Sequence, residues 1–290
     1  MERLICHPAV TPAGDDISDV MTKAAALAAG EADWWWENPP FEFHPVLEAN
    51  PDLVLAKTDP LGGIGCLRFN HLQPQFDNVN MRQAVLAVAD QADFMTVFAG
   101  DAKNWNHCPS FFTCGTPISS DAGAEALSGK RDFDKARRLI AEAGYKGEKI
   151  VVLDAVDQPN PHAHALVAAD LLKKLGLNVE IAASDWGSLV IRRASKAPID
   201  KGGWNVFGTG AVGSDGLDPT LNAWLRTNGD AAWFGWPSDD KIEALRQQWI
   251  KATDSAARKE LAAAIQERAF EVVPKSRPGN GQARPPIART

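Results

Sequence analysis

The chain has 290 residues, of which 45% are hydrophobic and 23% are charged, and its formal net charge is −7. A chain of this length and composition can bury a sizeable core, in one large domain or two ordinary ones. The shortage of basic side chains excludes the electrostatic basis of nucleic-acid binding and the basic helix of a membrane-surface protein. No apolar run approaches the about 18 residues of a spanning helix. Residues 1–12 do not have the pattern of a signal peptide, so the chain as written is expected to remain in the cytoplasm.

Helices are predicted where apolar residues recur at helical spacing after a capping side chain. In chain order, they cover residues 80–99 with Asp77 and Asn78 as candidate caps, 133–143 capped by Asp132, 161–175 ended by Gly176, 239–252 capped by Ser238, and a last helix capped by Asp254. Their apolar stripes are interpreted as core faces rather than as cofactor contacts.

Two predicted strands flank the helix at residues 161–175. Residues 148–154 and 178–183 are short apolar runs rich in β-branched side chains. Two strands joined by a helical crossover form a parallel pair, so the sequence predicts an α/β fold.

The four cysteines are Cys6, Cys66, Cys108 and Cys114, which are too few for a disulfide scaffold in a chain of this length. Only Cys108 and Cys114 are close enough in sequence to close a small bridged loop. Two interpretations stay open: a disulfide if the protein is exported, and two buried thiols otherwise.

The sequence shows no pattern of catalytic or metal-binding residues. His162 and His164 are two residues apart near a helix start, so they point to different faces and cannot chelate one metal together. His107, beside Cys108 and Cys114, lacks a fourth ligand and the Cys-x-x-Cys spacing of structural zinc sites. Motifs of nucleophile elbows, phosphate loops and metalloproteases do not occur. We therefore predict that the protein is not an enzyme and that it uses no metal and no cofactor.

The aromatic composition is unusual, because ten tryptophans accompany a single tyrosine. Several tryptophans lie in stretches without a helix or strand pattern, at residues 34–36, at Trp204 and at residues 233–236. Aromatic walls with few polar anchors hold organic ligands in many proteins. The alternative is a core position, because a large indole ring is mostly buried in any fold.

Several segments follow one another in an order that is specific to one family. In chain order, these segments are residues 24–36, similar to "alqaGeiDw"; 69–70 with 76–85, similar to "fN…PFdnvrvRqAl"; 117–127, similar to a Pro-rich loop; 134–145, similar to a "Dp-x-kAr-x-Ll-x-eAGY" helix; and 185–186 with 208–219, similar to the strand and loop of a ligand cleft. Together they resemble the bacterial extracellular solute-binding proteins of family 5, the peptide- and dipeptide-binding components of ABC transporters.

The resemblance implies a class II periplasmic-binding-protein-like α/β fold whose N-terminal part is missing. Residues 1–66 are expected to be the C-terminal fragment of ligand-binding lobe I, and residues 67–272 to be ligand-binding lobe II. Residues 273–290 are rich in Pro, Gly and Arg and are expected to be disordered. A frameshifted end is the alternative, because one choice of codons for residues 275–290 reads in another frame as a peptide that resembles the family's ending.

The resemblance also implies ligand-binding residues. Asp215 matches the family's acidic anchor for a ligand ammonium group, whose carboxylate accepts charge-assisted hydrogen bonds. The alternative for Asp215 is an aspartate that forms a turn beside a glycine. Trp186, Trp204 and Phe207 are candidates for the wall of the cleft. Residues 155–159 lack the arginine that dipeptide binders place there, which favours oligopeptides or other cationic solutes over a free dipeptide.

By this resemblance, the protein is the substrate-binding component of an ABC importer. It is expected to capture a peptide or a related small cationic solute in the periplasm and to deliver it to the permease in the membrane. Two alternatives stay open: a non-functional remnant of a truncated gene, and an intracellular interaction module that exposes the orphaned surface of the lobe.

Overall fold

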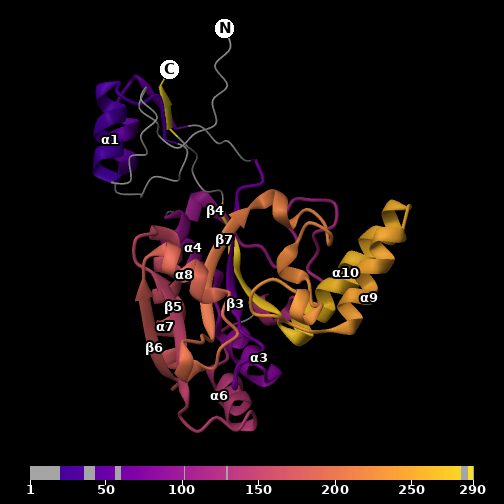
Figure 1. Ribbon diagram of the computed structural model, residues 1–290. Coiled ribbons are helices and arrows are strands. Elements are labelled where there is room, and N and C mark those ends of the chain that lie inside the picture. Colours follow the sequence, from indigo (N-terminus) through magenta and orange to yellow (C-terminus); the bar gives the residue numbers. More distant parts are fainter. Residues whose placement is uncertain are drawn as a thin grey trace.

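The computed structural model describes residues 20–35, 43–55, 60–100, 102–128, 130–281 and 287–289. These residues form two β-sheets (Figure 1): a small sheet of three strands in the order β1-β9-β2, and a large sheet of six strands in the order β4-β8-β3-β7-β5-β6. The strands are β1 Trp34–Trp35, β2 Leu53–Leu55, β3 Gly63–Phe69, β4 Trp105–Asn106, β5 Lys149–Ala155, β6 Asn178–Ser184, β7 Val206–Val212, β8 Lys275–Gly281 and β9 Ile287–Arg289.

The α-helices are α1 Val20–Ala29, α2 His44–Glu48, α3 Val79–Val88, α4 Gln91–Ala99, α5 Glu125–Ser128, α6 Phe133–Glu142, α7 Pro159–Lys174, α8 Trp186–Arg193, α9 Asp240–Lys251 and α10 Ser255–Val272. Within the described ranges, every helix is too short or too polar to cross a membrane. In Figure 1, α9 and α10 lie side by side and project from the side of the large sheet, while α1 belongs to the small sheet.

The large sheet is built around a parallel βαβ unit, as the sequence predicts. Strand β5 pairs in parallel with β6 on one side and with β7 on the other. Side chains of β5 alternate between two cores, because successive residues of a strand point to opposite faces. Ile150 and Val152 pack with Leu171 of α7, whereas Val151 and Leu153 pack with Leu189 of α8. The two crossover helices therefore cover opposite faces of the sheet, and the predicted α/β class is correct.

The predicted helix over residues 80–99 is divided into α3 and α4. Asn78 caps α3 through a hydrogen bond from the amide of Asn80, and Asp90 caps α4 through a bond from the amide of Ala92. The chain is extended at Ala89, between the two helices. The division was missed because the apolar spacing continues across Asp90, whose capping side chain starts a new helix.

The other capping predictions differ from the structure at one position. Asp132 and Asp254 accept hydrogen bonds from the amides of the third residue after each of them, as expected for N-caps. The cap of α9 is Asp239 rather than Ser238, since the Asp239 carboxylate accepts the bond from the Ile242 amide.

Arg82 and Gln83, which belong to the segment at residues 76–85, have a structural role. The Arg82 guanidinium donates to the carbonyl oxygens of Val272 and Val273, and the Gln83 side-chain amide donates to the carbonyl of Phe270. The last carbonyls of a helix have no partner within the helix. The two side chains therefore satisfy the C-terminal end of α10, and burial lowers the pKa of Arg82 to about 10.

The C-terminal segment continues into both sheets, so the prediction of disorder is wrong for its described residues. Strand β8 lies between β3 and β4, and β9 lies between β1 and β2. Gly65 pairs with Gly279 and Leu67 with Ser276, so a bulge in β8 contains Pro278. A proline at a bulge removes no hydrogen bond of the ladder. The amino-acid composition did not predict this strand, because the hydrogen-bond partners of β8 come from β3, which is far away in the chain. Residues 282–286 and 290 lie outside the described ranges, and the frameshifted end stays a prediction.

The predicted boundary between the two lobes falls inside a strand. Residues 63–66 pair with β7 throughout and belong to the large sheet, together with residues 67–69 of the same strand. The predicted boundary between Cys66 and Leu67 thus lies within one strand of the large sheet, and the division into lobes stays a prediction. The small sheet with α1 and α2 is called the small unit, and the large sheet with its helices the large unit. The small unit has a core of its own around Leu27, Trp35 and Leu47.

Candidate functional site

The candidate site lies at the edge of the large sheet where β5, β6 and β7 end. The chain passes from β5 to β6 on one side and then crosses back to β7 on the other side of β5. In open α/β sheets, ligands bind outside the carboxyl ends of the strands at such a switch point. The start of β3 and the end of β8 are also at this edge, since Gly63 pairs with both Val212 and Gly281.

Strand β7 has one edge that is only partly paired. All seven of its residues pair with β3, but β5 pairs with β7 only at Val206 and Phe207. Among the described residues, no strand pairs with this edge from Gly208 to Val212. Unpaired backbone groups on a strand can bind an extended peptide as an added strand.

Four aspartates follow the strands at this edge, and local structure occupies three of them. Asp157 accepts a hydrogen bond from the Trp186 amide at 2.8 Å. Asp185 caps α8, and its hydrogen bonds from the side chain and amide of Ser188 lower the pKa of its carboxyl group. Asp218 accepts bonds from Thr220 and from the amide of the next residue.

Asp215 is the fourth of these aspartates. It lies in the 3-10 turn Gly213–Gly216, directly after β7, and it is exposed. The described part of the chain gives its carboxylate neither a hydrogen bond nor an ion pair. The Asp215 carboxylate is therefore accessible at the end of the partly paired strand, and its role as a ligand anchor stays a prediction.

The three aromatic wall candidates have different environments. Trp186 is half-buried at the start of α8. Trp204 and Phe207 are both 0% exposed and pack edge to face, with ring centroids 5.0 Å apart. A side chain that is fully enclosed within this unit has no surface left for a ligand, so the wall role of Trp204 and Phe207 is wrong. Their local sequence does not reveal this, because burial under α8 is a tertiary property.

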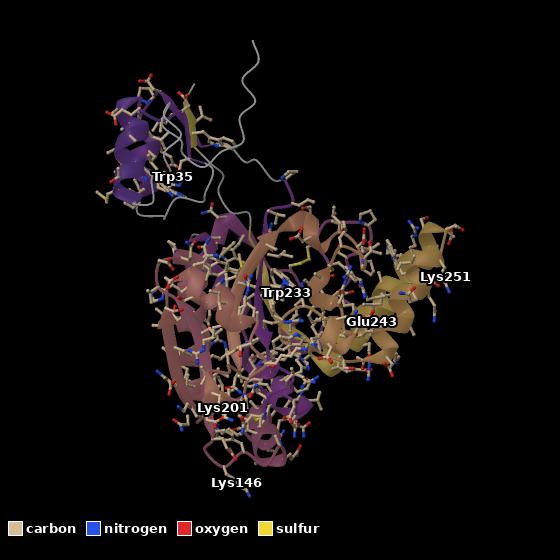
Figure 2. The ribbon with its side chains drawn as sticks, viewed as in Figure 1. Trp35, Lys146, Lys201, Trp233, Glu243 and Lys251 are labelled. Atoms are coloured by element: carbon tan, nitrogen blue, oxygen red, sulfur yellow. A yellow bond between two sulfur atoms is a disulfide. The ribbon has the colours of Figure 1, made fainter. Side chains whose placement is uncertain are left out.

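Trp233 and Phe234 are partly exposed and pack in the same cluster as Trp186. The sequence analysis noted their aromatic stretch but did not include them among the candidates for the wall. Trp233 lies over the middle of the large sheet (Figure 2) and packs against Phe207 and Phe234. The sequence signal for them was weak: residues 233–236 form an aromatic stretch without a helix or strand pattern.

Arg193, at the end of α8, is a charged group that the sequence analysis did not select. Its guanidinium carbon lies 5.4 Å from the ring centroids of Trp186 and Trp233 and 4.9 Å from that of Phe234. Its Nε is buried without a hydrogen-bond partner, and no described carboxylate forms an ion pair with the guanidinium. Burial lowers the pKa of Arg193. A partly buried cation among aromatic rings with no acidic partner is suited to accept an anionic group.

The structure joins Cys108 and Cys114 in a disulfide, while Cys66 is a buried free thiol. Thr113, inside the bridged loop, donates a hydrogen bond to the turn that carries Asp215.

Over the described ranges, no cluster of three or more His, Cys, Asp or Glu side chains is placed to hold a metal ion.

Comparison with known sequences identifies the family. The profile of the bacterial extracellular solute-binding proteins, family 5 Middle, matches residues 16–233. The chain is 35% identical over 259 residues to the probable peptide ABC transporter periplasmic-binding protein y4tO of Sinorhizobium fredii, covering 89% of this chain and 49% of that protein. It is 24% identical over 265 residues to the periplasmic oligopeptide-binding protein OppA of Salmonella typhimurium, covering 87% of this chain and 46% of that protein. The chain thus spans about half the length of these relatives.

Solved structures show the same fold. The binding protein AgaA from A. tumefaciens R10, in complex with agropinic acid, superposes with a TM-score of 0.77 at 21% identity, over 94% of this chain and 54% of that one. A dipeptide-binding protein from Pseudoalteromonas, in complex with Met-Leu, gives a TM-score of 0.74 at 20% identity, over 95% and 53%. The names of these four proteins all describe binding proteins. From the profile match and the 35% identical relative, the chain belongs to family 5 of the bacterial extracellular solute-binding proteins.

Proposed function

We propose that this chain is the ligand-binding lobe II, with a fragment of lobe I, of the substrate-binding component of an ABC importer. It binds a peptide or a related cationic solute outside the inner membrane and delivers it to the permease. The observation that carries the proposal is the exposed Asp215 carboxylate at the end of β7, beside the unpaired and accessible backbone of residues 210–212. Family membership and the peptide-binding names of the relatives support it.

The edge of β7 and the Asp215 carboxylate suit two parts of one peptide, its backbone and its N-terminus. An extended peptide pairs its backbone with the free edge of β7, which gives affinity without reading the sequence. Its N-terminal ammonium donates charge-assisted hydrogen bonds to Asp215. The large unit acts as lobe II and the small unit as part of lobe I, and the two lobes close on the ligand by a hinge movement.

Replacing Asp215 with asparagine tests the proposal. A hydrogen bond to a charged group contributes about 1.5–3 kcal/mol, so D215N should weaken trialanine binding by about 10- to 100-fold. Isothermal titration calorimetry measures this, with N-acetylated trialanine as the ligand that lacks the ammonium. Asp134→Asn, on the exposed surface of α6, is the control.

Two results would contradict the proposal. One is equal affinity for free and acetylated trialanine. The other is the absence of saturable binding or thermal stabilisation with any member of a peptide and amine library, which would favour a non-functional remnant.

Arg193 provides a second test, of selectivity for charge. If its guanidinium accepts an anionic ligand group, R193Q should weaken binding of Ala-Glu-Ala about tenfold and leave Ala-Gln-Ala within about twofold. Competition titrations of both tripeptides on the wild type and on R193Q measure the difference. Arg137→Gln, an exposed arginine of α6, is the matched control. A parallel loss for both tripeptides would show that Arg193 only supports the aromatic cluster.

A further inference from the structure

The turn that carries Asp215 is enclosed by two other segments of the chain. On one side, the amide of Gly213 donates to the carbonyl of Gly62 at 2.6 Å. A Cβ atom at position 213 would lie 2.5 Å from the backbone oxygen of Leu61. This side of the turn is therefore in contact with the segment that leads into β3, and only a glycine fits there.

Thr113 forms the other side. Its hydroxyl donates to the carbonyl of Gly213 at 2.5 Å, and its amide donates to the carbonyl of Gly216 at 3.0 Å. A Cβ atom at position 216 would lie 2.5 Å from the Thr113 hydroxyl oxygen. Thr113 is fully buried. The hydroxyl and the backbone amide of Thr113 thus hold the first and last residues of the turn, and Asp215 lies between these two residues.

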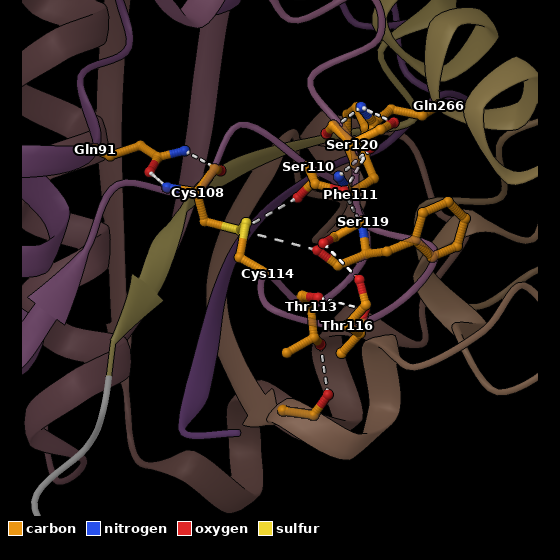
Figure 3. The surroundings of a disulfide bond; sticks show 12 residues. Gln91, Cys108, Ser110, Phe111, Thr113, Cys114, Thr116, Ser119, Ser120 and Gln266 are labelled. Atoms are coloured by element: carbon orange, nitrogen blue, oxygen red, sulfur yellow. Dashed lines mark hydrogen bonds between the residues drawn. A yellow bond between two sulfur atoms is a disulfide. The ribbon is translucent and has the colours of Figure 1, made fainter. Parts of the chain in front are cut away.

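Thr113 is itself held in place by the bridged loop (Figure 3). The disulfide between Cys108 and Cys114 closes this loop immediately beside Thr113. The backbone of Cys108 exchanges two hydrogen bonds with the side-chain amide of Gln91, on α4. Gln266 of α10 accepts hydrogen bonds from the Ser110 hydroxyl and from the Phe111 amide. The loop is therefore connected to two helices and by Thr113 to the turn.

We propose that Thr113, supported by the Cys108–Cys114 disulfide, is a positioning residue that fixes the Asp215 turn before the ligand arrives. This inference rests on the proposed ligand role of Asp215. A carboxylate on a fixed backbone binds an ammonium group without first ordering the turn, so less free energy is lost on binding. The hydroxyl of Thr113 reaches no ligand in this arrangement, because it is buried against Gly213.

Hydrogen exchange measured by mass spectrometry tests the positioning directly. Thr113→Val keeps the shape of the side chain but leaves the Gly213 carbonyl without its hydroxyl donor. Loss of a hydrogen bond worth about 1.4 kcal/mol should speed exchange of the amides of Gly213 and Leu217 about tenfold. Thr113→Ser, which retains the hydroxyl, should remain within about twofold of the wild type. Exchange in β5 (Lys149–Ala155) should be unchanged in both variants.

The disulfide is tested with Cys108→Ser/Cys114→Ser. This variant should also speed exchange of the amides of Gly213 and Leu217 while β5 stays protected. An unchanged rate at these two amides in the Thr113→Val variant would overturn the proposal. Equal acceleration in the turn and in β5 would also overturn it, since that result means general destabilisation.

Trialanine titrations then separate this proposal from the proposed function. If the wild type binds trialanine, Thr113→Val should weaken binding about tenfold, and Thr113→Ser should not. Unchanged affinity in Thr113→Val would remove the positioning role even if exchange increased. If the wild type does not bind trialanine, the proposed peptide function fails, and the exchange rates alone decide whether Thr113 holds the turn.

Discussion

Replacing Arg68 with methionine should lower the free energy of unfolding by about 3–5 kcal/mol. Arg68 lies near the end of β3 and is fully buried. Its guanidinium donates to the carbonyls of Phe234 at 2.5 Å, Trp224 at 2.9 Å, Trp233 at 3.1 Å and Pro274 at 3.3 Å. Methionine fills much of the volume but leaves the carbonyls of Phe234 and Trp224 without a donor. Those of Trp233 and Pro274 keep contacts with the Trp236 amide and the His71 ring.

The same contacts explain why lysine should not replace Arg68. A lysine has one nitrogen and cannot reach carbonyls that are arranged around a planar fork. The partners belong to the loop after β7 and to Pro274, which lies between α10 and β8, so Arg68 joins both segments to β3. Burial lowers the pKa of Arg68 to about 10, which still leaves it charged at neutral pH.

Urea unfolding followed by circular dichroism measures this effect as a shift of the midpoint at an unchanged slope. Arg137→Met is the matched control, because Arg137 pairs with Asp134 on the surface and is 58% exposed. The control should change stability by no more than about 0.5 kcal/mol. A loss for Arg68→Met no larger than that of the control would contradict the assigned role of Arg68.

Lowering the pH from 7 to 5 should destabilise the protein, and His164→Leu should remove about 2 kcal/mol of that loss. His164 lies on α7 between the rings of Phe94 and Phe98, and Gly208 of β7 approaches its Cβ. Neither ring nitrogen has a hydrogen-bond partner among the described residues. Burial lowers the pKa of His164 from 6.5 to about 4.

The sign follows from the two protonation states. Below pH 6.5 the unfolded chain binds a proton at His164 that the folded chain does not bind until about pH 4. Stability therefore falls as the pH decreases through this window, by about 3 kcal/mol over its whole width. Above pH 6.5 the group contributes no dependence on pH. Burial and the neighbouring arginines also lower the pKa of His71, so part of the acid sensitivity should persist in His164→Leu.

Urea midpoints at several pH values between 7 and 5 measure the difference between wild type and His164→Leu. His107→Gln is the control, since His107 is exposed. Parallel pH profiles for the wild type and His164→Leu would contradict the assignment, because the buried imidazole would then contribute nothing to the acid sensitivity.

Features that depend on neighbouring residues could be predicted from the sequence. Periodicity predicts the strands of the βαβ unit and the helix between them. Local hydrogen bonds explain the caps Asn78, Asp132 and Asp254, because each side chain accepts a bond from an amide two or three residues away. The family motifs also predicted the α/β class, which the sheet confirms. The break at Asp90 was missed because apolar spacing alone does not report a new cap.

Features whose partners are distant in the chain could not be predicted in this way. Residues 275–281 are a strand because β3 supplies their hydrogen bonds, whatever their composition favours. Trp204 and Phe207 became core because α8 and the loop at residues 233–236 cover them, whereas Trp233 and Arg193 remained accessible. Burial and long-range hydrogen bonding are properties of the assembled sheet, so no local pattern in the sequence could have assigned these positions.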